Sequence, residues 1–202
     1  TDGTEPTKNA TVYTQPLKIT KTTDLKAKAF GSEGESSWGQ KFIFNKATVR
    51  PITFLSKPTH NYTFNGAITL VDGQRGNKNS RSGQWLGFSE APCEVVITLP
   101  ENTPIKEVSF KSFIDTGDWI YPPTHFEVQG STDGKNYETL AKEDYQLPTK
   151  HFREIKDYKL SFKEKKVTYL KVKINEVNRI PAFHNGAVGK PGFLFIDEIE
   201  VN

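Results

Sequence analysis

Residues 95–114 read VVITLPENTPIKEVSFKSFI and contain two runs in which apolar and polar side chains alternate. The first run extends from Val95 to Leu99, and the second from Val108 to Ile114. Because side chains two positions apart lie on the same face of a strand, each run predicts a half-buried strand of an antiparallel sheet. The LPEN sequence at 99–102 predicts a turn.

The same alternation recurs at 170–174, and turn signals separate such runs along the chain. Asp-Gly pairs at 72–73 and 133–134 predict tight turns. No stretch repeats apolar residues at the spacing of an amphipathic helix over three turns. Many short strands with regular turns therefore predict an all-β protein built from β-sandwiches.

A domain boundary is indicated at TVRPITFLSKP, where two prolines bracket a short apolar segment. We expect a first domain at 1–48, a linker at 49–58 and a second domain at 59–202. The first domain holds expected strands around 17–19, 25–30 and 41–44, and its length is close to the lower limit for a free-standing core without disulfides or metal. We therefore expect it to be incomplete or to lean on the second domain.

The second domain has room for about eight strands and a complete sandwich core. Its core is expected to include aromatic side chains: Phe54, Tyr62, Phe64, Trp85, Phe88, Phe110, Phe126, Tyr169 and Phe195.

Composition excludes several classes of protein. The 202 residues include 27 Lys and Arg against 24 Asp and Glu, spread along the chain and not gathered into a patch, which argues against nucleic-acid binding. The single cysteine, Cys93, excludes an intrachain disulfide and is expected to be a small buried side chain. No apolar run is long enough to span a membrane. The chain has no methionine and opens on TDGTEPT, so we expect an excised piece of a longer polypeptide.

No arrangement of residues predicts catalysis. Asp115 and Asp118 flank Thr-Gly before Trp119 and could form an acid and base pair, but turn caps and exposed loop carboxylates are commoner. The histidines are far apart and have no zinc-ligand spacing: His60, His125, His151 and His184. We therefore expect no active site in these residues.

The loop LVDGQRGNKNSRSGQWLGF, residues 70–88, is long, polar and rich in glycine. Asp72, the neighbouring Asn side chains and the backbone carbonyls supply the oxygen ligands that Ca²⁺ requires. The alternative is that these residues only make turns.

The closing segment FLFIDEIEV, residues 193–201, breaks the alternation of a half-buried strand. Strict alternation would put Asp197 on one face and Glu198 on the other, each among apolar residues. At least one of these carboxylates must then lie beside buried side chains, which is unfavourable for an ionised group without a partner. Either a bulge turns it toward the surface, or a cation or a set of N–H donors binds it.

Several motifs in residues 61–202 resemble the coagulation factor 5/8 type C, or discoidin, domain. They are ITLVDGQRG, GQWLGF, EVVITL, DWIYPPTHFEVQGSTDGKNY and the final IPAFHNGAVGKPGFLFIDEIEV. The resemblance implies a galactose-binding-like jelly-roll β-sandwich of the kind that includes family 32 carbohydrate-binding modules. Its variant looks like the one appended to bacterial exo-acting glycosidases, with glycoside hydrolase family 20 hexosaminidases the nearest case.

Residues 1–48 are similar to the small, immunoglobulin-like β-sandwich that follows the catalytic barrel in chitobiases and β-hexosaminidases. The stretch TDGTEPTKNATVYTQPLKITKTTDLKAKAF carries this resemblance. The family's first strand, which normally precedes TDG, is missing, so the resemblance implies an incomplete sandwich.

The discoidin resemblance also implies two sites. A structural calcium ion would be held by the Asp72 and Glu198 side chains and by carbonyls near Leu70 and from Gln74 to Asn77. Sugar would bind to loops at one end of the sandwich, where an aromatic ring stacks on the pyranose and polar side chains bind its hydroxyls. The candidates for sugar binding are Trp119, Asp115, Asp118, His184 and Asn185.

Each sugar-site candidate has a structural alternative. Trp119 could pack on Pro122 at the rim, and His184 could brace its glycine-rich loop. Phe193 stands where tryptophan is expected in the family, which argues against a stacking platform at that position.

The resemblance implies a monomeric, non-catalytic carbohydrate-binding region of a secreted, periplasmic or cell-surface β-N-acetylhexosaminidase. Its partners would be a glycan with terminal galactose or N-acetylhexosamine and the catalytic domain of the same chain. One alternative is a purely structural domain that packs on the catalytic barrel. Another is an adhesive discoidin module, for which only Ile120 and Tyr121 could provide the exposed apolar tips.

Overall fold

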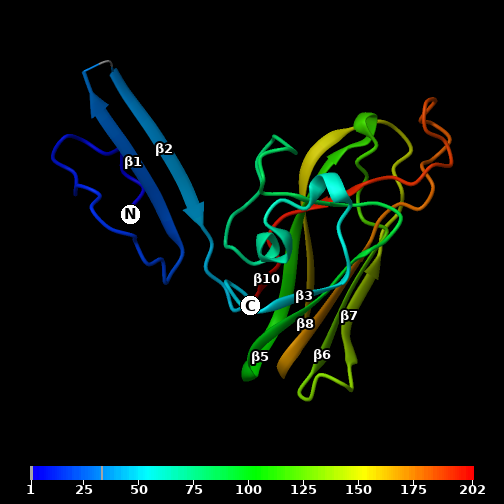
Figure 1. The fold of residues 1–202 in the computed structure, drawn as a ribbon. Coiled ribbons are helices and arrows are strands. Elements are labelled where there is room, and N and C mark those ends of the chain that lie inside the picture. The colour runs from blue at the N-terminus through cyan, green and yellow to red at the C-terminus, as the bar shows by residue number, and fades with distance from the viewer. Residues whose placement is uncertain (1, 33) are drawn as a thin grey trace.

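The computed structural model describes residues 2–32 and 34–202, and strands dominate it (Figure 1). The strands are β1 (Thr23–Gly31), β2 (Gly34–Phe42), β3 (Ile52–Ser56), β4 (Leu86–Phe88), β5 (Cys93–Asp115), β6 (His125–Ser131), β7 (Glu138–Asp144), β8 (Arg153–Asn175), β9 (Leu194–Ile196) and β10 (Glu200–Val201). Three short 3-10 helices join them: η1 (His60–Tyr62), η2 (Gly66–Leu70) and η3 (Thr116–Asp118). None of the helices in the described ranges has the length and apolar character needed to cross a membrane.

The N-terminal part is a two-stranded antiparallel ribbon of β1 and β2, which lies beside the sandwich (Figure 1). Residues 17–19, where a strand was expected, lie outside any strand, and Leu17 is exposed. The strand expected at 41–44 instead ends at Phe42 and begins at Gly34. Its sequence, GESSWGQKF, has no apolar alternation, so pairing of its backbone with β1 determines the strand.

The C-terminal part is organised around β5 and β8, which are 23 residues each and pair along most of their length. The sheet order is β4-β9-β5-β8-β6-β7, and β3 and β10 also pair with β5. The first half of β5 pairs with β3, whereas the second half pairs with β9 and β10. One long strand thus contributes to both layers of the sandwich.

The turn expected at LPEN is wrong, because this sequence lies inside β5. The pairing of β5 with β8 shifts register between Thr98 and Thr103, and Asn102 has a φ of 55°. Such a bulge bends a strand and increases its twist. The proline and asparagine therefore bend β5 without ending it.

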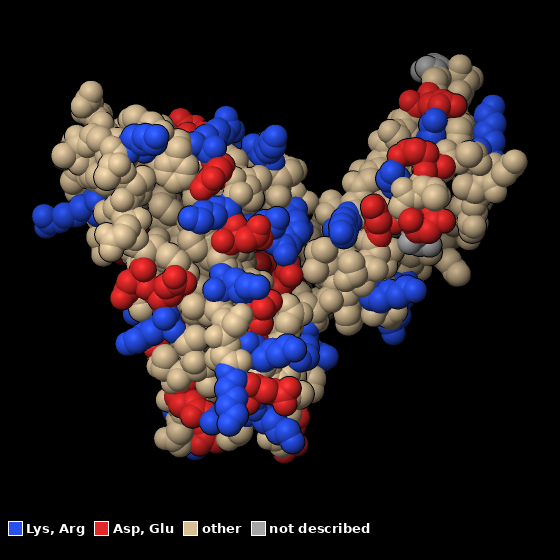
Figure 2. Space-filling view, turned by 180° about the vertical axis from the view of Figure 1, so that it is seen from behind, with Lys and Arg blue, Asp and Glu red and all other residues tan. Residues whose placement is uncertain are grey.

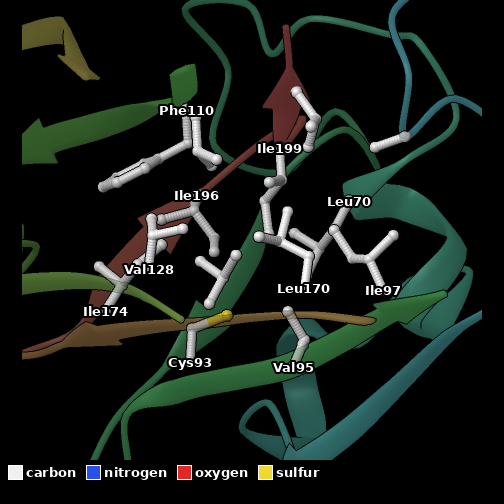
Figure 3. Close-up of a cluster of buried hydrophobic side chains, with 14 of the residues drawn as sticks. Leu70, Cys93, Val95, Ile97, Phe110, Val128, Leu170, Ile174, Ile196 and Ile199 are labelled. Carbon is white, nitrogen blue, oxygen red and sulfur yellow. The ribbon is translucent and has the colours of Figure 1, made fainter. Parts of the chain in front are cut away.

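The core fills the space between the two layers. Its main cluster joins buried side chains from both halves of the second domain, among them Leu70, Cys93, Val95, Ile97, Phe110, Val128, Leu170, Ile174, Ile196 and Ile199 (Figure 3). Cys93 is fully buried, as expected.

Most of the expected core aromatics are buried or half-buried. Trp85 and Phe88, for example, are fully buried, and Phe54 packs against the main cluster. Phe64 is an exception at 40% exposure. Its φ of 36° places it in a left-handed turn that follows η1, so its ring does not reach the core.

The segment between the ribbon and the sandwich is anchored to the sandwich. Ala47 is fully buried in the main core cluster, and the Lys46 backbone N–H donates to the Val201 carbonyl at 3.0 Å. Further along, β3 pairs with β5. Residues 49–58, where a linker was expected, therefore contain a strand of the large sheet.

Charged side chains of both signs are mixed on the surface. Figure 2 shows Lys and Arg interspersed with Asp and Glu over the face it presents, without a continuous basic patch.

Candidate functional site

Three loops at one end of the sandwich meet around Trp119 and His184. The two rings approach edge to face, with 6.3 Å between their centroids. His151, from the loop between β7 and β8, lies 5.1 Å from the ring of Phe183 and 5.1 Å from that of His184. We call these four aromatic rings the loop cluster.

Trp119 is held in an unusual backbone conformation. It follows η3 with a φ of 66°, a left-handed geometry that is strained for a bulky residue. Its carbonyl accepts a hydrogen bond from the Phe193 N–H at 2.8 Å. Lys190 places its ammonium 5.2 Å from the ring centroid, so a cation covers part of the indole.

His184 connects two of the loops. Only 7% of the residue is exposed, and its Nε2 lies 3.4 Å from the Gly117 carbonyl. Its Nδ1 is buried and has no hydrogen-bond partner among the residues that the structure describes. The imidazole therefore ties the loop before β9 to η3, and it also carries an unused polar atom inside the loop cluster.

The remaining sugar-site candidates, Asp115, Asp118 and Asn185, do not share the contacts of Trp119 and His184. The Asp115 carboxylate pairs with Arg153 Nε at 3.2 Å, so an ion pair engages it. Asp118 and Asn185 are exposed on their loops. The structure thus brings Trp119 and His184 into contact and gives Asp115 a protein partner.

The tips proposed for an adhesive discoidin module are not exposed. Ile120 is 6% exposed and Tyr121 is fully buried. Ile120 packs in a cluster with Trp85 and Phe195, because its backbone is bridged to Asp115 and Phe193 and its side chain faces inward. Neither residue can serve as an apolar tip.

A second group of polar side chains lies at the closing segment, where both carboxylates are fully buried. Alternation predicted opposite faces, but the strand is interrupted between β9 and β10, and both side chains turn inward. Asp197 accepts backbone N–H groups from Gly76 at 3.0 Å and Lys111 at 2.9 Å. Burial raises the pKa of Asp197 to about 7, although these donors oppose the shift.

Glu198 has neutral partners. It accepts the Gly73 N–H at 2.9 Å and the Asn45 side-chain amide at 3.2 Å. Burial, and to a lesser degree the neighbouring negative charge of Asp72, raises the pKa of Glu198 to about 9. Glu198 and Asp72 are thus two neighbouring acidic groups with only neutral hydrogen-bond donors. A cation bound between them would favour the ionised form of both.

The residues expected to bind calcium would offer the ion different oxygen atoms. Glu198 and Asp72 lie close enough to repel each other, and a hard cation would relieve this repulsion. Leu70 contributes a carbonyl that already accepts the Ile199 N–H at 2.7 Å and has a second lone pair.

Asn77 does not fit. Its carbonyl accepts the Trp85 indole N–H, and its side-chain oxygen accepts the Asn79 N–H. Within residues 2–32 and 34–202, no three His, Cys, Asp or Glu side chains form a ready metal site. A calcium site here would therefore depend largely on backbone oxygens.

Comparison with protein families assigns the chain. The model of the F5/8 type C domain matches residues 52–185, which is more than half of the chain. The protein belongs to the F5/8 type C domain family. The model of the chitobiase/beta-hexosaminidase C-terminal domain matches residues 1–40 of the same chain. Both family resemblances indicated by the sequence are confirmed, as is the all-β fold. No curated protein matches the sequence.

Several solved structures resemble this F5/8 type C domain protein. CpGH89CBM32-5 from Clostridium perfringens, in complex with GalNAc-beta-1,3-galactose, is 18% identical with a TM-score of 0.48, covering 75% of this chain and 93% of that chain. Chitosan-binding module 1 from a chitosanase/glucanase of Paenibacillus sp. IK-5 is 16% identical with a TM-score of 0.47, covering 79% and 98%. CpGH89CBM32-4 from Clostridium perfringens, in complex with GlcNAc-alpha-1,4-galactose, is 16% identical with a TM-score of 0.44, covering 78% and 92%.

Sequence reasoning missed His151 and Phe183 of the loop cluster in this F5/8 type C domain, and also Lys190, whose ammonium lies over the Trp119 ring. The register that joins Asp115 to Arg153 brings the loops after β5 and before β8 to the same end of the sandwich. His151 Nδ1 accordingly lies 3.4 Å from Thr116 Oγ1. Antiparallel pairing of β5 with β8 would have predicted that the loop after β5 and the loop before β8 lie together. The sequence alone does not give the register of that pairing.

Proposed function

We propose that this chain is a non-catalytic carbohydrate-binding region that targets or orients a glycosidase on its glycan. The observation that carries the proposal is the loop cluster at one end of an F5/8 type C domain, where Trp119 and His184 meet. Of the three solved structures described above, two are complexes with a sugar and one is named a chitosan-binding module. The N-terminal match further supports a β-N-acetylhexosaminidase parent that is secreted, periplasmic or on the cell surface.

The ligand of the loop cluster is a terminal galactose or N-acetylhexosamine. Aromatic rings provide apolar surface for the ring face of a pyranose, and exposed polar side chains provide partners for its hydroxyl groups. Trp119 supplies the first, and Asp118 and Asn185 supply the second. Asp115 supports the loop through Arg153. Such a site binds weakly and gains by tethering an enzyme to a substrate with many copies of the sugar.

Isothermal titration with a panel of hexoses and N-acetylhexosamines tests the proposal. We expect binding in the millimolar range that is lost in Trp119→Ala. Trp38→Ala is the matched control, because Trp38 is 52% exposed on the ribbon, away from the loop cluster. If no glycan binds, the result supports the alternative in which the sandwich only packs on the catalytic domain of its parent.

We also propose a structural calcium ion bound by Glu198 and Asp72 with backbone carbonyls that include that of Leu70. The support is the burial of Glu198 beside a second carboxylate with only neutral donors. When bound, the ion would supply the positive charge that keeps both carboxylates ionised.

Chelation tests the calcium site. EDTA should lower the melting temperature of the wild-type protein, whereas Glu198→Gln should melt at the same temperature with and without EDTA. Elemental analysis of the purified protein shows whether the ion survived dialysis. A wild-type sample free of calcium that does not change its melting temperature on calcium addition would contradict the site.

A further inference from the structure

A cleft opens at the end of the sandwich opposite the loop cluster, where β6 and β8 separate. Their pairing ends at Ser131 and Tyr169. Beyond this point β8 continues along β5, with Lys166 opposite Pro104, whereas β6 turns into β7 (Figure 1). The resulting cavity has a volume of about 290 Å³. This is near the lower limit for small-molecule sites, so it suits a ligand of about one sugar ring.

The floor of the cleft is apolar and aromatic. Val167 is 1% exposed, and Tyr137 forms a wall of the cavity. The Lys171 ammonium lies 4.1 Å from the centroid of the Tyr137 ring, which fixes the ring orientation. The Tyr137 ring can contact the face of a pyranose, as aromatic walls do in sugar sites, whereas Val167 is almost fully covered.

The rim of the cleft carries donors in excess of acceptors. Lys165 pairs with Glu138 at 2.7 Å, but no carboxylate of the described residues lies within ion-pair distance of Lys166. The nearby Asp133 is ionised and is held in its turn, because it accepts the backbone N–H groups of Lys135 and Asn136, the Asn136 side-chain amide and the Ser131 hydroxyl. Lys166 is therefore the charged group at the rim with which a ligand carboxylate would pair.

We propose that this cleft binds an acidic sugar unit, with its carboxylate at Lys166 and its ring against Tyr137. The Thr132 hydroxyl, also at the rim, is a partner for a ring hydroxyl. The cleft is separate from the loop cluster, so this second site does not depend on the proposed function. A chain with both sites would hold a glycan that contains neutral and acidic units.

The test uses the whole chain and an oligogalacturonate as probe, titrated at low ionic strength. We expect Lys166→Gln to weaken binding about threefold to tenfold, as for the loss of one exposed ion pair. Lys57→Gln makes the same charge change at an exposed position directly after β3, and this variant should bind the probe like wild type.

Several results would overturn the proposal. One is a neutral galactose oligomer that binds as well as the oligogalacturonate, or an equal effect of Lys166→Gln and Lys57→Gln. Another comes from amide NMR shifts: the probe should perturb Gly130, Tyr137 and Lys166, and changes confined to residues 116–119 and 183–186 would place it elsewhere. An absence of any binding by the wild-type chain would also reject the site.

Discussion

At the scale of single residues, Gly76 is the most constrained position near the buried carboxylates. A Cβ atom there would lie 2.2 Å from the Trp85 indole ring, and Trp85 is fully buried. The Gly76 N–H also donates to Asp197. A larger side chain would have to displace the indole and the loop together.

We therefore expect Gly76→Ala to lower the free energy of unfolding by about 3 kcal/mol or more, at the upper end of the range for overpacking. Denaturant unfolding followed by tryptophan fluorescence measures the change. Gly186→Ala is the control, because a Cβ there meets its nearest neighbour at an ordinary 3.8 Å. Equal stabilities of the two variants would show that the Trp85 contact is not tight.

The environment of the two buried carboxylates, Asp197 and Glu198, was predictable only in part. Asp197 and Glu198 stand out in the sequence because they interrupt an apolar run. Their burial could be anticipated for one of the two but not for both, since the donors come from Gly73, Gly76 and Lys111, far away in the chain. Binding by N–H donors was one of the alternatives that the sequence left open, and both side chains accept such hydrogen bonds.

At the scale of secondary-structure elements, the turn between β6 and β7 depends on Asp133. The hydrogen bonds from Lys135 and Asn136, with further bonds from the Asn136 and Ser131 side chains, hold the pKa of Asp133 well below its usual range. A carboxyl group with a lowered pKa in the folded state stabilises the protein above its unfolded pKa of about 4. This stabilisation is lost as the pH falls toward the folded-state pKa.

Asp133→Asn should therefore lower the melting temperature at neutral pH, and the difference from wild type should shrink as the pH falls below about 4. Thermal melts across this range measure it. Asp118→Asn, at an exposed loop position, serves as the comparison. A difference between Asp133→Asn and wild type that stays constant down to acid pH would mean that the turn does not depend on the ionised carboxylate.

Elements were predicted best where side chains alternate. The strands at 95–99 and 108–114 follow the apolar pattern and lie in β5, whereas β2 has a polar sequence and forms through backbone pairing. The bulge at LPEN was missed because proline and asparagine usually indicate turns, and only the register against β8 reveals a continuous strand. Local signals report turns and alternation, not which strands become partners.

At the scale of the whole molecule, the structure suggests where the sandwich begins. Asn45 accepts the Ala47 and Val201 N–H groups with its side-chain oxygen and donates to Glu198. Ala47 lies in the main core cluster. Ile52 and Phe54 on β3 pack against that cluster. The sandwich thus includes residues that precede the expected start at 59.

Two truncations test this limit. A chain that starts at residue 43 should melt within about 3 °C of the full protein, since it keeps Asn45, Ala47 and β3. A chain that starts at residue 59 should lose about 4 kcal/mol or more of stability, because it exposes the core under β3 and removes Asn45, one of the two hydrogen-bond partners of Glu198. If both truncated chains melted alike, the segment 43–58 would not be part of the folding unit.

The sequence was informative about fold class and family because alternation, turns and motifs are local. It was less informative about the loop cluster and the domain limit, because both arise from pairing between distant segments. Lys46 contacts Val201, and His151 contacts Phe183 and His184. Neither contact leaves a pattern in the spacing of residues.

The position of β5 at the centre of the sheet has a consequence for synthesis on the ribosome. β5 is translated before β8, β9 and β10, all of which pair with it. Until residues 194–201 emerge, one side of its second half lacks its partners and exposes backbone groups that could pair with other chains. Correct folding of the nascent chain therefore requires that this strand be protected until translation has passed β10.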